Sequence, residues 1–64
     1  MKLDEIKQAV SNGKTVHWAN ELYTVVKWTN GYHILCSSND HAIGLTHRDG
    51  ITMNGREEQF YIAP

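Results

Sequence analysis

Apolar residues near the start of the chain recur at helical spacing, and the pattern changes after the first glycine. Leu3, Ile6 and Val10 are three and four residues apart, which places them on one face of a helix. Asn12-Gly13 follows directly and is a typical C-terminal helix stop. The pattern therefore predicts a short amphipathic helix over residues 2–11.

The rest of the chain, residues 15–62, has the pattern of short antiparallel strands. β-branched and aromatic residues dominate it, and the turn dipeptides Asn30-Gly31, Asp49-Gly50 and Asn54-Gly55 interrupt it at short intervals. Strands are predicted at 15–19, 22–29, 32–37, 41–47, 51–53 and 57–62. The predicted fold class is α+β, a single domain over 1–64. A short N-terminal helix precedes a five- or six-stranded antiparallel meander that curls into a small SH3-like barrel to cover its core.

Turn positions set the expected register of the strands. A two-residue turn at Asn30-Gly31 pairs Trp28 with His33, and a loop over 37–40 places Gly44 opposite His33. A further two-residue turn is expected at 20–21. Because side chains alternate along a strand, these pairings assign residues to two faces. The expected core face carries Val16, Trp18, Tyr23, Val25, Tyr32, Ile34, Cys36, Ile43, Leu45, Phe60 and Ile62.

The opposite face carries threonines, as a solvated face should, but also a cluster of aromatic and aliphatic residues. The candidate binding residues on it are Trp28, His33, Val26, Leu35, His17 and Gly44. Apolar patches of this kind often mark an interaction site. Two arrangements of the helix are open. It either lies across this patch and buries it, or caps one end of the barrel and leaves Trp28 exposed.

Charge and composition exclude several classes of function. The 64 residues carry six basic and seven acidic side chains, a net charge of −1, and the basic residues are scattered. Proteins that neutralise phosphate backbones usually carry a basic stripe. No apolar run approaches the ~20 residues of a membrane span, so no membrane partner is expected. A single cysteine and the absence of an apolar leader favour a cytoplasmic protein.

Four histidines and one cysteine raise the question of a metal site. His33, Cys36, His41 and His47 do not have the spacing of a zinc motif. His33 and Cys36 are also three positions apart, and because this separation is odd they face opposite ways on one strand. We expect no bound metal and no other cofactor.

Ser38, His41 and Asp40 have the side chains of a nucleophile, a base and a group that orients the base. The groups of such a catalytic set normally converge from separate elements of the fold, whereas these three are close neighbours in sequence. Clusters of Ser, Asn and Asp more often form turns. Cys36 is expected to be inert packing. The sequence therefore predicts a protein that is not an enzyme.

The function predicted from sequence is a small non-catalytic binding module. Its partner is another protein or a second copy, reached through the aromatic and aliphatic sheet face or by pairing of an exposed sheet edge. The alternative is a small barrel that binds single-stranded nucleic acid by stacking on Trp28 and Tyr61.

Overall fold

The computed structural model describes residues 1–64 and begins with one helix, α1 (Leu3–Ser11). At its start the carboxylate of Glu5 accepts a hydrogen bond from the Lys2 backbone N–H at 2.9 Å. At its end Gly13 has a φ of +80°. The N–H groups of Gly13 and Lys14 donate to the carbonyls of Val10 and Ala9, which is a Schellman motif. The helix and its Asn12-Gly13 stop are thus confirmed, with the helix beginning one residue later than predicted.

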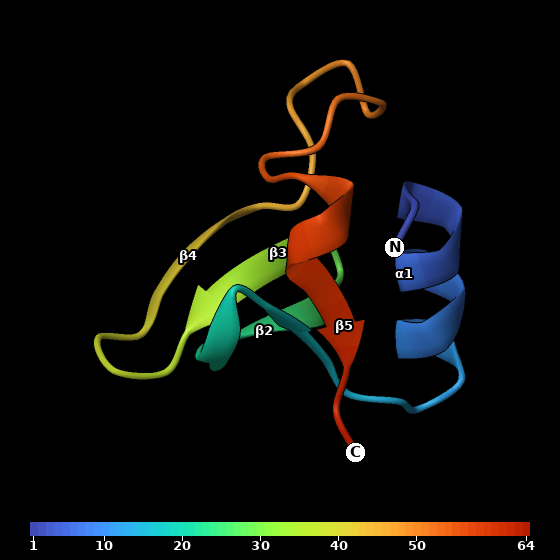
Figure 1. Cartoon of the computed structure of the whole chain (residues 1–64). Coiled ribbons are helices and arrows are strands. Elements are labelled where there is room, and N and C mark those ends of the chain that lie inside the picture. Colours follow the sequence, from blue (N-terminus) through green and yellow to red (C-terminus); the bar gives the residue numbers. More distant parts are fainter.

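Five strands form one antiparallel sheet with the order β4-β3-β2-β1-β5 (Figure 1). They are β1 (Val16–Trp18), β2 (Asn20–Trp28), β3 (Gly31–Cys36), β4 (His41–Gly44) and β5 (Phe60–Ile62). The α+β class and the antiparallel sheet are confirmed. The sheet is open, with β4 and β5 at its two edges, so the SH3-like barrel is not confirmed.

The β2–β3 hairpin differs from the predicted register by two residues. Trp28 is the Cα partner of Gly31, and Val26 is the partner of His33. The two loop residues are Thr29 and Asn30, because the backbone conformation that needs glycine, a φ of +123°, falls at Gly31. A shift of two residues keeps every side chain on its predicted face, because the period of a strand is two. The predicted pairing of His33 with Gly44 is confirmed.

The turn between β1 and β2 is tighter than predicted. A single residue, Ala19, turns the chain with a φ of 66°, so Trp18 is opposite Asn20 and not Tyr23. A bulge between His17 and Trp18 then restores the predicted strand pairing, in which the partner of His17 is Thr24. The bulge brings the rings of Trp18 and Tyr23 into an edge-to-face contact, with centroids 5.0 Å apart.

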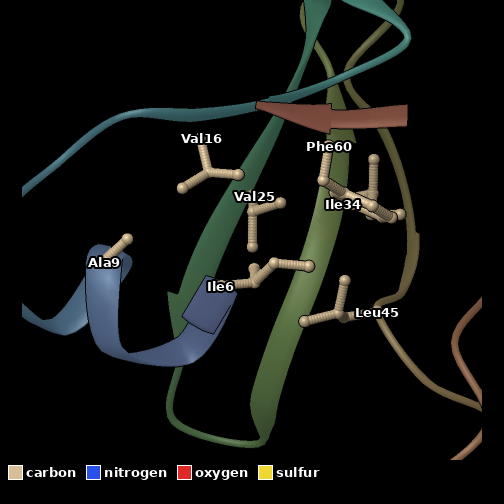
Figure 2. Packing of buried hydrophobic residues seen from close by; sticks show 7 residues of the cluster. All are labelled: Ile6, Ala9, Val16, Val25, Ile34, Leu45 and Phe60. Atoms are coloured by element: carbon tan, nitrogen blue, oxygen red, sulfur yellow. The ribbon is translucent and has the colours of Figure 1, made fainter. Parts of the chain in front are cut away.

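The hydrophobic core lies between α1 and one face of the sheet, which we call the inner face. Its buried members are Ile6, Ala9, Val16, Val25, Ile34, Leu45 and Phe60. Figure 2 shows Ile6 pointing from the helix toward Val25 and Ile34. The helix therefore neither crosses the Trp28 face nor caps a barrel, but Trp28 is 45% exposed, as the second predicted arrangement required. The helix leaves both sheet edges uncovered, so Ile43 on β4 and Ile62 on β5, predicted as core, are 51% and 44% exposed.

The chain between β4 and β5 is mostly irregular and rises away from the sheet (Figure 1). The predicted strand at 51–53 is reduced to one isolated bridge between Thr46 and Met53. Asn54 does not form the predicted hairpin turn. Its side-chain amide donates to the carbonyls of Gly44 and Thr46, at 2.8 and 3.3 Å, and so holds the two ends of the loop together.

A 3₁₀ turn, η1 (Glu57–Gln59), replaces the first half of the predicted last strand. It positions Gln59, whose side-chain oxygen accepts hydrogen bonds from the Trp18 indole N–H and the Arg56 backbone N–H, at 3.2 and 3.0 Å. The Trp18 ring also packs on Gly55, where a Cβ would lie 2.5 Å from Nε1. Trp18 is therefore fixed in place by residues about forty positions later in the chain.

Candidate functional site

The six residues predicted as a binding site lie together on the side of the sheet that faces away from α1. One row of Cα partners crosses all five strands through Ala42, Leu35, Thr24, His17 and Tyr61. A second row joins Gly44, His33 and Val26, and Trp28 lies beyond it next to Gly31. We call this surface the outer sheet face. Its residues are His17, Leu22, Thr24, Val26, Trp28, His33, Leu35, Ala42, Gly44 and Tyr61.

The centre of this surface is an aromatic pair. The rings of Trp28 and His33 stack with centroids 4.7 Å apart and planes inclined by 30°. Their contact is diagonal, because the hairpin register makes Val26, and not Trp28, the partner of His33. Gly44 on the other side of His33 adds no side chain, so the imidazole stands clear of β4. Trp28 remains 45% exposed even with this contact.

Hydrogen bonds to the backbone fix both outer-face histidines. The Nδ1 atom of His33 is 3.2 Å from the carbonyl oxygen of Gly31, and that of His17 is 3.0 Å from the carbonyl oxygen of Tyr23. A carbonyl only accepts, so Nδ1 carries the proton in both rings and Nε2 is an acceptor when the ring is neutral. The His17 ring also contacts Tyr61, with centroids 5.6 Å apart.

Four members of the outer sheet face were not among the predicted site residues, namely Leu22, Thr24, Ala42 and Tyr61. Leu22 and Tyr61 are 48% and 38% exposed and extend the apolar surface to the β1 and β5 side of the sheet. The signal for Tyr61 was its position between Phe60 and Ile62, since alternation places it opposite to both. For Leu22 the signal was the same alternation, which places it on the predicted face of Val26 and Trp28.

The outer sheet face has no Asp, Glu, Lys or Arg among its residues. The ammonium groups of Lys7 on α1 and Lys27 on β2 lie over the ring of Tyr32, 5.5 and 5.8 Å from its centroid, on the inner side. The surface is therefore neutral when its histidines are neutral, and its contacts with another molecule would come from apolar area and ring stacking.

The turn between β3 and β4 contains the residues weighed for catalysis. The Ser38 hydroxyl is 3.2 Å from the Cys36 sulfur, and the Asn39 side chain accepts the His41 backbone N–H at 3.0 Å. The hydrogen bond from the Ser38 hydroxyl, joined by the backbone N–H groups of Ser38 and Asn39, lowers the pKa of the Cys36 thiol. Cys36 is thus buried, as expected, and the pKa of its thiol is held below the ordinary value.

His33 and Cys36 face opposite sides of the sheet, as the odd separation predicts. No three side chains among the His, Cys, Asp and Glu residues gather where they could hold a metal ion. No helix in the chain combines the length and the apolar character needed to cross a bilayer.

Comparison with protein-family models, with curated proteins and with solved structures finds no match to this chain.

Proposed function

We propose that this protein is a non-catalytic binding module that works through its outer sheet face, and that it binds a second copy of itself there. The observation that carries the proposal is the position of α1. The only helix of the fold covers the inner face and leaves the Trp28–His33 stack, with Val26 and Leu35 beside it, open to other molecules.

The composition of the outer sheet face differs from that of an ordinary solvated sheet face. In an antiparallel sheet with one face exposed to solvent, apolar residues that point to the core usually alternate along each strand with polar residues that point to the solvent. Here the central strands β2 and β3 place Val26, Trp28 and Leu35 outward, and Leu22 and Tyr61 extend the surface. Trp and Tyr are among the residue types that most often supply the binding energy of an interface.

The extent and neutrality of the surface suit a second copy. The 25 strand residues, at ~3.3 Å per residue and ~4.8 Å between strands, span a sheet face of roughly 400 Å². A standard interface removes about 800 Å² from each partner, so a face of roughly half that area suits a weak dimer that forms as the concentration rises. Two copies can stack face to face as a sandwich, because no like charges then meet at neutral pH.

Single-stranded nucleic acid is a weaker candidate for the same surface. Trp28, His33 and Tyr61 could stack on bases, but stacking sites are normally framed by a cationic groove. Lys7 and Lys27 lie on the other side of the sheet, beside Tyr32. A cytoplasmic location is part of the proposal, because it keeps the lone Cys36 thiol reduced.

Sedimentation velocity from micromolar to submillimolar concentration tests the proposal. The wild type should pass from the 7.3 kDa monomer to a dimer as concentration rises. Trp28→Ala should weaken dimerisation by at least about 30-fold, the loss typical of a hot-spot residue. Ile51→Ala is the matched control, since Ile51 is 76% exposed in the loop outside the outer sheet face, and it should dimerise like the wild type.

Three outcomes contradict the proposal. They are a wild type that stays monomeric throughout, a dimer that Trp28→Ala leaves intact, and an equal loss in both variants. A monomer that shifts the mobility of single-stranded DNA at low salt, and loses that shift in Trp28→Ala, would assign the surface to nucleic acid instead.

A further inference from the structure

A cavity of about 170 Å³ lies on the inner face, at the end of the sheet that α1 does not reach. Its apolar wall is made by Trp18, Tyr23, Ile34, Cys36 and Ile43. Ile34 is shared with the hydrophobic core, so the cavity continues the core beyond the edge of the helix. The half-exposed side chain of Ile43 marks the place where the core lacks a cover.

The aromatic wall of the cavity is held in a fixed position. Trp18 meets Tyr23 edge to face at 5.0 Å, and the Trp18 indole N–H donates to Gln59 at 3.2 Å. Gly55 packs against the same indole so closely that a Cβ there would clash. A preformed wall of this kind binds a ligand without first having to be ordered.

The lining also indicates the chemistry of the ligand. Asn39 and His41, both exposed, complete it with hydrogen-bonding groups, and no Asp, Glu, Lys or Arg contributes. A volume near 150 Å³ accepts a benzene ring, whereas pockets for drug-sized molecules start near 300 Å³. The cavity is therefore the size of one ring and favours a neutral molecule.

We propose that this cavity is a binding site for a small neutral molecule with one aromatic ring and a hydrogen-bonding substituent directed at Asn39 or His41. The ring would contact Trp18 and Tyr23 on one side and Ile43 on the other. The Cys36 thiol faces the bound ring and reports its presence. This site is on the opposite side of the sheet from the outer sheet face and is independent of the function proposed for that face.

Phenol is a suitable probe, because it has one ring, one hydroxyl group and no charge. Titrated into ¹⁵N-labelled protein, it should shift the amide signals of Cys36, Asn39 and Ile43 with a common saturation curve. Benzoate, of similar size but negatively charged, should bind more weakly by at least about tenfold, because the cavity offers its carboxylate no charged partner. Saturating phenol should also slow the alkylation of Cys36 by iodoacetamide.

Two isoleucines on opposite sheet edges provide a matched pair of variants. Ile43→Ser should weaken phenol binding by about tenfold, because it removes one apolar wall. Ile62→Ser, which changes a similarly exposed side chain on β5, should leave it unchanged, and so should Trp28→Ala. If Ile43→Ser fails to fold, the protection of wild-type Cys36 by phenol decides the question.

Several results would overturn the assignment. Phenol shifts that do not saturate, or that spread evenly over the surface, would show that no site exists. Equal binding of phenol and benzoate, equal loss in both isoleucine variants, or an unchanged rate of Cys36 alkylation would each place the ligand elsewhere.

Discussion

The indole of Trp28 lies against the imidazole of His33 on the side of the sheet that the helix does not cover, with ring centroids 4.7 Å apart. The two residues come from neighbouring strands of one hairpin and meet diagonally, because Trp28 pairs with Gly31. Within this stack the Trp28 side chain remains about half exposed to solvent. It gives the outer sheet face a rigid aromatic centre that the fold does not use for its own core.

The two faces of the sheet should differ in how much they contribute to stability. Ile6 is fully buried between α1 and the inner face, so Ile6→Ala should lower the free energy of unfolding by about 2–5 kcal/mol. Trp28→Ala should lower it by only about 1 kcal/mol, since it removes a half-exposed ring and one stacking contact. Urea unfolding of both variants at a concentration where the wild type is monomeric measures this. If Trp28→Ala lowered the free energy of unfolding by more than Ile6→Ala does, Trp28 would belong to the core.

Dimerisation should weaken in mildly acidic solution. A protonated imidazole would lose its hydration in an apolar interface, which disfavours the charged ring there. The side chains that border His33 are Trp28 and Val26, and those that border His17 are Thr24 and Tyr61, so no carboxylate stabilises either cation. Affinity should therefore be lower in mildly acidic solution than in neutral solution.

Sedimentation between pH 5 and 8 measures this dependence. The double variant His17→Gln, His33→Gln should show little pH dependence, while His47→Gln, which changes an exposed loop histidine, should behave like the wild type. A flat wild-type profile would contradict the presence of histidine in the interface.

The loop after β4 should open at low pH. Hydrogen bonds from the Thr52 hydroxyl and from the Ile51 and Thr52 backbone N–H groups lower the pKa of Asp49 from 3.8 to about 2. Because the folded pKa is the lower one, the contribution of this carboxylate is complete above about pH 4 and is lost as the pH falls toward 2.

The amide shifts of Ile51 and Thr52 should follow that titration. Asp49→Asn should abolish the acid-dependent step at these two amides, whereas Asp40→Asn in the β3–β4 turn should retain it. A step near pH 4 in the wild type would mean that the three hydrogen bonds to Asp49 do not persist in solution.

Cys36 should react faster with iodoacetamide than a free cysteine side chain of equal exposure. The Ser38 hydroxyl bond lowers its pKa, so Ser38→Ala should raise that pKa and slow alkylation at neutral pH several-fold. Ser37→Ala removes a neighbouring hydroxyl that donates to the Leu22 carbonyl instead, and it should leave the rate unchanged. Equal rates in the wild type and Ser38→Ala would exclude this role of Ser38.

The parts of the fold that depend on local pattern could be predicted from sequence. The spacing of Leu3, Ile6 and Val10 marked the helix, and alternation placed Trp28 and His33 on one face. The predicted register of the β2–β3 hairpin was wrong by two residues, but the assignment of faces was still correct, because side-chain direction in a strand repeats every two residues. Ala19 was missed because a non-glycine residue with a φ of 66° gives no sequence signal.

The side of the sheet that α1 covers could not be predicted. Both faces carry apolar residues, and the amphipathic pattern of the helix is compatible with either one. The choice depends on long-range packing, such as that of Ile6 in one buried cluster with Leu45 and Phe60, which no local window of sequence contains. The cavity beside Cys36 was missed for the same reason, since Gln59 and Gly55 hold Trp18 from far along the chain.

The central claim is that two copies meet through the outer sheet face, and an isotope-filtered NOE experiment tests it most directly. In a mixture of ¹³C,¹⁵N-labelled and unlabelled protein, the isotope filter selects cross-peaks between a proton of a labelled copy and a proton of an unlabelled copy, so only contacts between copies are observed. We predict cross-peaks from the Trp28 ring of one copy to Val26, Leu35 or Tyr61 of the other. Intermolecular cross-peaks confined to the edge strand β4 or to the loop around Ile51, with none at Trp28, would contradict the account.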